Sequence, residues 1–168
     1  DKMASAVLVT TSKELAEAVQ KEIEIQIQRL ERAEIARASI DGNGKIIVVD
    51  DIKTAIDIAN EIAPEHLELC VDNPFDYLDE IRHAGSVFMG KSCPEALGDY
   101  LAGANHTLPT SGTAKFSSPL SVDDFVKKTQ YTYYTADALK RVAYDVAYFA
   151  EQEGLYAHAK SAVIRLEE

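Results

Sequence analysis

The feature of the sequence that most constrains the fold is the alternation of short apolar runs with amphipathic segments over residues 4–89. Ala4–Thr10 and Lys45–Asp50 are continuous apolar runs rich in Val and Ile, which predict buried strands. His66–Val71 and Ser86–Met89 predict two further strands. Successive strands that are separated by helices need crossover connections, which favour parallel pairing. The alternation therefore predicts an α/β fold with a mostly parallel sheet and flanking helices.

Helical periodicity fills the gaps between these runs. Ser12 can cap a long amphipathic helix that runs to about Arg32, because apolar residues recur there every three to four positions. Gly and Asn tolerate positive φ, so Asp41–Gly44 is expected to be a turn. Further helices are expected over Glu34–Ile40, Asp51–Ile62 and Asn73–His83.

The regular alternation stops after Gly90. Lys91–Leu120 is rich in Gly, Pro, Ser, Thr and Asn, and it predicts only a short helix around Pro94–Leu101. A loop of this length inside a compact domain is usually functional or disordered. Its aromatic residues and specific polar residues favour a functional loop.

The last part of the chain predicts helices alone. Ala136–Gln152 has one apolar face, Gly154 interrupts the pattern, and Leu155–Leu166 continues as a second helix. We therefore predict two parts. Residues 1–120 form a partial α/β domain with the functional loops, and residues 121–168 form a small helical appendage.

Composition narrows the classes of function. A formal net charge of −11 argues against nucleic-acid binding, which needs clustered Lys and Arg. No apolar run approaches the roughly 20 residues that span a bilayer, so no membrane association is expected. The two cysteines, Cys70 and Cys93, are too few for a disulfide framework and follow no secretory signal. A cytoplasmic protein is the expectation.

Glu65 and His66 place an acid beside an imidazole where a predicted helix gives way to a predicted strand. A His side chain is the natural general base near neutral pH, and a nearby carboxylate can orient it or activate water. The alternative is a structural His at a helix C-terminus, beside a Glu that faces solvent. His83 is expected to have only such a structural role.

Asp99 and His106 lie at two ends of a loop that Gly103 and Pro109 shape. A carboxylate and an imidazole in such a loop could bind zinc or a polar substrate. The alternative is an Asp near the start of a helix and an unrelated loop His.

His158 stands on the first turn after the break at Gly154, among small residues that leave room for a partner surface. A lone His on an apolar helix is otherwise a packing residue, and that alternative stays open from the residues alone.

Three stretches in order resemble the histidinol dehydrogenase family: APEHLEL at Ala63–Leu69, GDYLAGANHTLPTSGTA at Gly98–Ala114, and GLYAHAKSA at Gly154–Ala162. The spacing between them also matches, and together they extend over most of the chain. The resemblance implies a zinc-dependent oxidoreductase of histidine biosynthesis that converts L-histidinol through L-histidinal to L-histidine with two NAD molecules in turn. It further implies a homodimer in which the C-terminal helical part reaches the partner's active site.

The resemblance also implies roles for individual residues. Glu65 and His66 would be the catalytic acid–base pair, and Asp99 and His158 would be zinc ligands. Residues expected to contact the substrate are His66, Asp99, Tyr100, His106, Glu153 and His158. No residue of the chain is expected to bind NAD.

One part of the family pattern does not occur in this sequence. In the family, the remaining zinc ligands are a Gln and a His three residues later, in the segment immediately before the one that starts here at Asp1. The family's cofactor-binding domain also precedes this point. We therefore expect the C-terminal portion of such an enzyme, with an incomplete Rossmann-like domain, weak zinc binding and no activity by itself. The rival hypothesis is a non-catalytic α/β dimerisation or binding module. A hydrolase is disfavoured because no nucleophile-elbow motif occurs.

Overall fold

Short parallel strands organise the first part of the chain in the computed structural model, which describes residues 1–167. Strand β1 (Val7–Thr10) pairs in parallel with β2 (Lys45–Val48), and β3 (His66–Leu69) pairs in parallel with β4 (Ser86–Met89). The predicted α/β class with parallel pairing is confirmed. Within residues 1–167 the four strands form two separate pairs instead of one continuous sheet.

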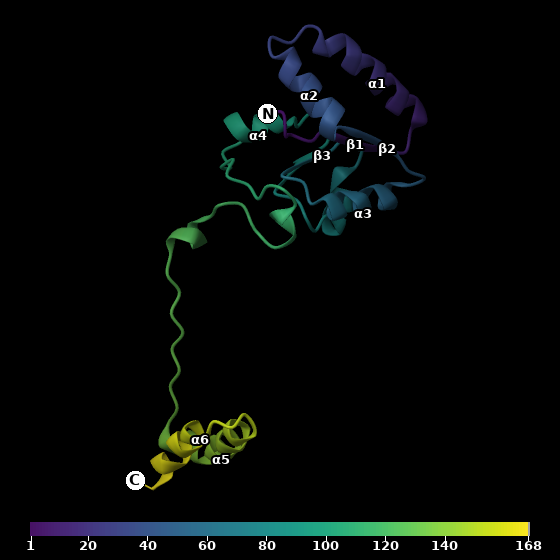
Figure 1. Ribbon diagram of the computed structural model, residues 1–168. Helices are drawn as coiled ribbons and strands as arrows, with labels where there is room; N and C mark the ends of the chain where they lie inside the picture. Colours follow the sequence, from purple (N-terminus) through teal and green to yellow (C-terminus); the bar gives the residue numbers. More distant parts are fainter. Residues whose placement is uncertain (168) are drawn as a thin grey trace. The chain divides into compact units, whose positions relative to one another are not determined.

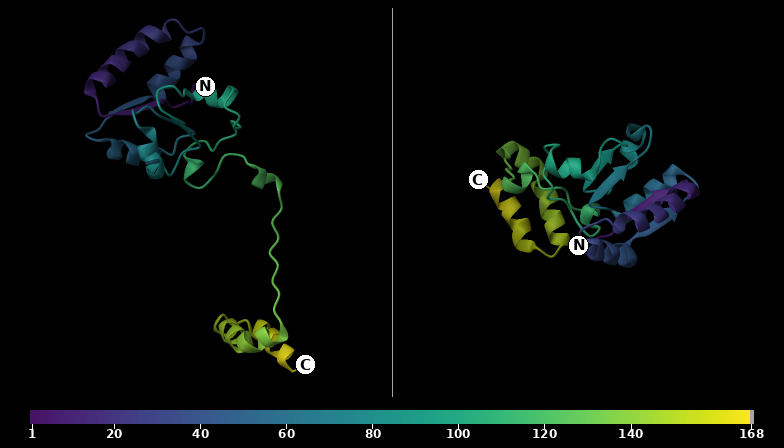
Figure 2. Two further views of the ribbon diagram at one scale, coloured as in Figure 1. Left: turned by 180° about the vertical axis from the view of Figure 1, so that it is seen from behind. Right: turned by 90° about the horizontal axis from the view of Figure 1, so that it is seen from above.

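Three helices cover the strands. They are α1 (Lys13–Ile27), α2 (Ala33–Asn43) and α3 (Ile52–Ile62). Figures 1 and 2 show α1 and α2 on one side of the strands and α3 on the other. Both α1 and α3 begin with a side-chain cap, since Ser12 Oγ accepts from Leu15 N at 3.1 Å and Asp51 Oδ1 accepts from Thr54 N at 2.7 Å.

Two helix boundaries differ from the prediction. Helix α1 ends at Ile27 instead of running to Arg32, and α2 continues to Asn43 through the predicted turn. Tertiary hydrogen bonds hold the end of α2 against the N-terminal segment. Ser5 Oγ donates to Asn43 O at 3.0 Å, and Asn43 Nδ2 donates to Lys2 O at 3.3 Å. These contacts override the local preference of Gly42 for a turn.

The segment before β4 also differs from the prediction. It forms a 3₁₀ helix, η1 (Pro74–Glu80), instead of a helix that reaches His83. The buried Asn60 of α3 explains the early end: its Oδ1 accepts from Arg82 N at 2.8 Å and from His83 N at 3.1 Å, and its Nδ2 donates to Glu80 O at 2.9 Å. Backbone groups that a longer helix would use are thereby bonded to Asn60.

Beyond β4 the chain follows the predicted loop, with one short helix, α4 (Glu95–Tyr100), where a short helix was expected. Two 3₁₀ turns follow, η2 (Thr113–Lys115) and η3 (Val122–Phe125). The largest side chains of the buried core within residues 1–125 are Ile27 of α1, Ile56 of α3, and Leu69 and Phe88 of the second strand pair.

The chain divides into two compact units, Asp1–Phe125 and the residues from Val126 onward. The second unit contains α5 (Ala136–Gln152), α6 (Tyr156–Val163) and the 3₁₀ turn η4 (Ile164–Leu166). Its two helices agree with the prediction, and Gly154 turns the chain between them with φ +73°. None of the helices in residues 1–167 is long and apolar enough to cross a membrane.

Candidate active site

The site begins with three side chains on one face of the β3–β4 pair. Side chains two apart on a strand point to the same face, so His66 and Glu68 of β3 share a face. The register aligns Glu68 with Phe88 of β4, which puts the Phe88 ring on that face as well. Its centroid lies 5.9 Å from that of the His66 ring, with the rings tilted by 37°.

Helix α4 lies against this face. Glu68 Oε1 accepts a hydrogen bond of 2.8 Å from Glu95 N, and so bonds one of the free N–H groups at the start of the helix. Gly98, one turn further along, faces the Phe88 ring without an intervening side chain. Strand residues thus determine where the helix begins and how closely it approaches.

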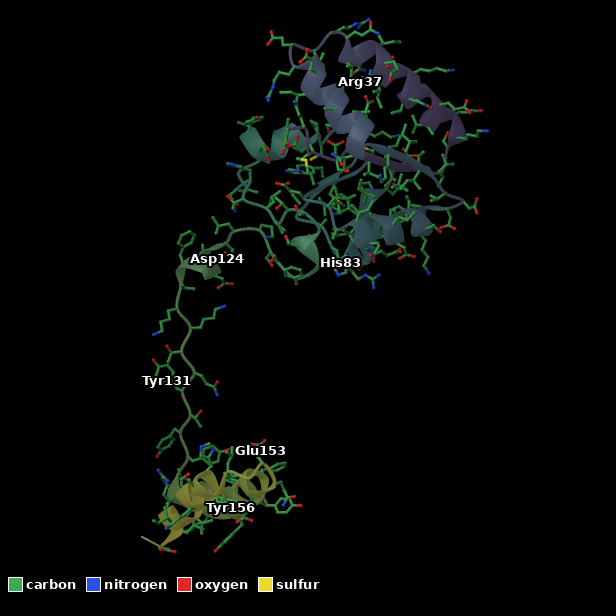
Figure 3. The ribbon with its side chains drawn as sticks, in the orientation of Figure 1. Arg37, His83, Asp124, Tyr131, Glu153 and Tyr156 are labelled. Carbon is green, nitrogen blue, oxygen red and sulfur yellow. The ribbon has the colours of Figure 1, made fainter. Side chains whose placement is uncertain are left out.

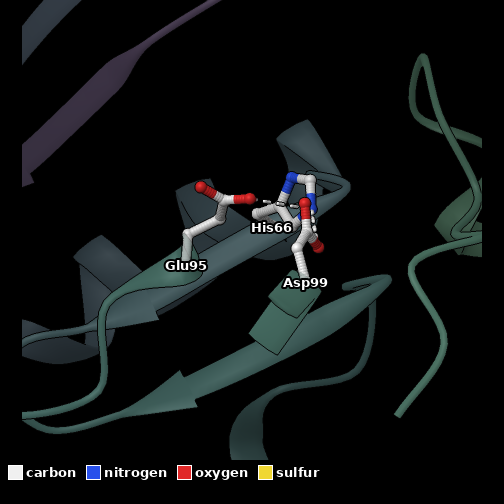
Figure 4. Close-up of side chains that lie close together, drawn as sticks. All are labelled: His66, Glu95 and Asp99. Carbon is white, nitrogen blue, oxygen red and sulfur yellow. Dashed lines mark ion pairs between the residues drawn. The ribbon is translucent and has the colours of Figure 1, made fainter. Parts of the chain in front are cut away.

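Two carboxylates of α4 face one imidazole nitrogen of His66 (Figure 4). His66 Nε2 lies 3.7 Å from Glu95 Oε1 and 3.9 Å from Asp99 Oδ1. The side chains of His66 and Asp99 are 28% and 27% exposed. Within residues 1–167, Nε2 is shielded from solvent and has no hydrogen-bond partner. A polar atom of this kind is available to a ligand that enters between the three groups.

The two carboxylates influence each other. Burial raises the pKa of Glu95 above its usual value, and the hydrogen bond and negative charge of Asp99 add to the increase. The opposing influence of His66 is smaller. Like charges held this close favour a shared proton or a bound cation between them.

His66, Glu95 and Asp99 could hold a metal ion, since one ligand atom of each lies within 4.8 Å of the others. Imidazole nitrogen and carboxylate oxygen are both common zinc donors. The donor chemistry therefore fits the predicted metal. Asp99, one of the two predicted zinc ligands, belongs to this cluster. The other, His158, belongs to the second unit.

Glu65 immediately precedes β3 and is half-buried. Ala63 ends α3 in the left-handed conformation, with φ 50°, and turns the chain toward the strand. Glu65 O accepts from Ser86 N at 2.9 Å, and a Cβ on Gly85 would come within 2.6 Å of the same oxygen. The backbone of Glu65 is thus fixed closely beside that of β4, while its acid–base role stays a prediction.

Tyr100 and His106 lie on the exposed side of the same region. Tyr100, the last residue of α4, is 85% exposed. His106 is exposed in the loop that follows. That loop is bonded on both sides of His106, because Asn105 Nδ2 donates to Leu120 O at 2.7 Å and Leu120 N donates to Thr107 O at 3.0 Å.

Glu153 and His158 belong to the second unit (Figure 3 labels Glu153), and both are exposed. Glu153 follows α5 directly as its C-terminal cap residue, and His158 stands in the first turn of α6, where its N donates to Leu155 O at 3.0 Å. The structure brings His66 and Asp99 together in the first unit. The roles predicted for Glu153 and His158 stay predictions.

Glu95 is a member of the cluster that we did not predict. The available signal is its spacing, because Glu95 and Asp99 are four residues apart in a segment expected to be helical, which places both on one helix face. Phe88 and Gly98 were also not predicted, and no local pattern in the sequence reveals that they meet.

Residues 1–166 match the family profile described as histidinol dehydrogenase. The chain belongs to the histidinol dehydrogenase family. A histidinol dehydrogenase of Caldanaerobacter subterraneus subsp. tengcongensis is 62% identical over 165 residues, which cover 98% of this chain and 38% of that protein. One of Bacillus cereus is 55% identical over 168 residues, which cover 100% of this chain and 39% of that protein.

A crystal structure of histidinol dehydrogenase from Elizabethkingia anophelis has the same fold as this chain, with a TM-score of 0.85 and 37% sequence identity. The match covers 96% of this chain and 37% of that one. The chain thus spans less than two fifths of the length of the histidinol dehydrogenases that it matches.

Proposed function

We propose that this chain is the C-terminal portion of an enzyme that oxidises L-histidinol through L-histidinal to L-histidine, with NAD as the hydride acceptor in both steps. The observation that carries the proposal is the cluster in which His66 faces Asp99 and Glu95, within a chain that matches the histidinol dehydrogenase family along its length. We assign NAD binding to none of its residues.

In the proposed mechanism His66 moves the protons. A neutral imidazole takes the hydroxyl proton as hydride leaves the adjacent carbon, and the carboxylates of Glu95 and Asp99 stabilise the positive charge that the imidazole then carries. In the second half of the reaction, Glu65 assists in activating the water that adds to the aldehyde. Proton transfer by one such group contributes about 10²- to 10⁴-fold to a rate.

The proposed metal is zinc, with Asp99 and His158 as ligands. When bound, zinc would orient the amino alcohol and its imidazole ring. The position of Asp99 beside the proposed base His66 supports this assignment, because carboxylate oxygen is a common zinc donor and a metal held there would lie next to the group that takes the proton. Tyr100, His106 and Glu153 would contact the substrate.

We further propose a homodimer with a shared active site. Glu153 and His158 are exposed on the second unit, and so are several large aromatic side chains of its two helices. Apolar side chains of this size that stay exposed within one small unit favour another surface that covers them. The partner subunit supplies that surface in this proposal.

We propose that the isolated chain is inactive. The experiment therefore has to distinguish an incomplete dehydrogenase from a chain with a different function. The chain and a chimera, in which it replaces the matching segment of the Bacillus cereus relative, are supplied with L-histidinol, NAD and zinc while absorbance at the nicotinamide band is followed. We expect turnover by the chimera and none by the chain. A chimera that folds but shows no turnover would contradict the proposed function and favour the non-catalytic binding module. Turnover and tight zinc binding by the chain alone would contradict its proposed inactivity.

A further inference from the structure

Phe88 is the largest side chain buried at the candidate site, with 4% of its surface exposed. One part of its ring lies against the imidazole of His66, at a centroid distance of 5.9 Å. A buried ring packed in this way limits the positions that the imidazole can occupy.

The same ring also contacts the backbone of α4. A Cβ on Gly98 would lie 2.9 Å from Phe88 Cζ and closer still to Cε1, so there is no room for a side chain at this position. Gly98 does not have a positive φ, and the helix conformation itself does not require glycine. Glycine inside a helix costs about 0.5–1 kcal/mol relative to alanine. Its close approach to the ring gives a structural reason for glycine here.

We propose that Phe88 and Gly98 are positioning residues that set the separation between the His66 imidazole and the carboxylates of α4. Gly98 lies between Glu95 and Asp99 on α4, while Phe88 touches both this helix and the imidazole. The resulting distances, 3.7 and 3.9 Å, are too long for direct hydrogen bonds, so within the described residues 1–167 Nε2 keeps its bonding capacity for a ligand. The effect of this separation on turnover rests on the proposed function. The role of Phe88 and Gly98 in setting the separation does not depend on that function.

The test is Gly98→Ala, with Gly42→Ala as its matched control. Both glycines lie in helices, but a Cβ on Gly42 would meet nothing within 4 Å. Helix propensity alone predicts that either change stabilises the protein. We expect Gly42→Ala to follow that expectation, whereas Gly98→Ala lowers the melting temperature and moves the imidazole NMR signals of His66 while those of His83 stay in place.

Turnover of the chimera provides a second measurement. A displacement of about 1 Å in an active site can cost roughly 100-fold in rate, so Gly98→Ala should lower kcat by roughly 10- to 100-fold. Phe88→Leu removes ring atoms from the contact and should restore part of that kcat in the Gly98→Ala background, although it lowers kcat on its own. If both substitutions acted only by destabilising the protein, Phe88→Leu would lower kcat in either background instead of raising it in the Gly98→Ala background.

The inference is overturned if Gly98→Ala is stabilised like Gly42→Ala, with unchanged His66 signals and unchanged kcat. If Gly98→Ala does not fold, nuclear Overhauser contacts in the unaltered chain decide instead: Phe88 ring protons must reach both the His66 imidazole and Gly98 Hα. An inactive chimera with shifted His66 signals in Gly98→Ala would refute the proposed function and leave the positioning role standing.

Discussion

The two units of the molecule differ in that only the first partly buries any of its predicted site residues, although Tyr100 and His106 of that unit are exposed. In the first unit His66 and Asp99 are about a quarter exposed and face each other across the contact between β3 and α4. In the second unit Glu153 and His158 are exposed at the turn between α5 and α6. The first unit thus brings two predicted site residues together by itself, while those of the second unit are accessible to another surface, as the proposed shared site requires.

Packing differs between the units in the same sense. The first unit buries large side chains, including Ile56, Leu69 and Phe88. The second buries alanines, with Ala147, Ala150 and Ala159 forming its core cluster, while Tyr144, Tyr148, Phe149 and Tyr156 are 60–71% exposed. A helix pair held by alanines gains little from burial, because each methyl group removes little apolar surface from water. We infer that burial within the second unit contributes less to its stability than burial within the first unit does.

The largest predicted effect tests whether residues of the two units act in one reaction. In the chimera, His66→Asn should lower kcat by about 10²- to 10⁴-fold, because the proton acceptor is lost. His158→Asn should lower zinc affinity as well as turnover. If the site is shared between subunits, mixing the two variants should restore part of the activity, measured as NADH formation after joint refolding.

His83→Asn is the matched control for that experiment, since the His83 ring contacts the backbone of Asn60 and lies outside the cluster. It should leave kcat within about twofold of the unaltered chimera, a change worth less than 0.5 kcal/mol. Mixed dimers of His66→Asn and His158→Asn without any recovery would contradict the shared site.

A second prediction concerns the interior of the first unit. Asn60 is 5% exposed and bonds three backbone groups of the segment before β4. Asn60→Ala should lower the free energy of unfolding by about 1–3 kcal/mol, because buried polar groups lose their partners. Denaturant titration measures the loss, and hydrogen exchange should place it at Arg82 and His83. Asn105→Ala removes two exposed hydrogen bonds, one to Leu120 O and one from Thr107 N, and should cost less. Equal losses in the two variants would show that burial does not decide the cost.

How far the sequence predicts this molecule depends on the range of the contacts involved. The parallel strands, α4 and the α5–α6 pair follow from local periodicity, which acts within a few residues. The early end of η1 does not, because Asn60 bonds groups more than twenty residues away in sequence. The continuation of α2 through Gly42 likewise depends on contacts between Asn43 and the N-terminal segment.

The candidate site shows the same division. His66 and Asp99 could be selected from their chemical types and from the family resemblance. Glu95 could have been found from its spacing to Asp99 on a short helix. The contact of Phe88 with Gly98 could not, because it depends on how closely a helix approaches a strand pair, and neither local pattern encodes that distance.

A third, smaller effect is expected in the second unit. Thr135 Oγ1 accepts from Ala138 N at 3.2 Å and caps α5. Thr135→Ala should cost about 1 kcal/mol of the stability of this helix, read as faster amide exchange in its first turn. Thr132→Ala, at an exposed position before the helix, is the matched control and should leave this exchange unchanged. Equal exchange in the two variants would show that the cap contributes nothing.

The smallest effect concerns a charged contact between α1 and α2 in the first unit (Figure 3 labels Arg37). Arg37 Nη1 and Nη2 donate to the Glu24 carboxylate at 2.8 and 2.7 Å, and this bond lowers the pKa of Glu24 below its usual value of 4.5. Because the folded pKa is the lower one, the contribution to stability is complete above the unfolded pKa and is lost as the pH falls through the folded pKa. Exposed pairs contribute little and are screened by salt.

Glu24→Gln should therefore lower the melting temperature slightly at neutral pH and low salt, and the difference should disappear in acid and shrink at high salt. Glu31→Gln, at an exposed position between the same helices, controls for the change in net charge. If Glu24→Gln destabilises the protein more than Thr135→Ala does, a surface ion pair would outweigh a helix cap. The contrast between a first unit stabilised by buried side chains and a second unit with little burial would then be incomplete, because surface charge would have to be counted among the main sources of the first unit's stability.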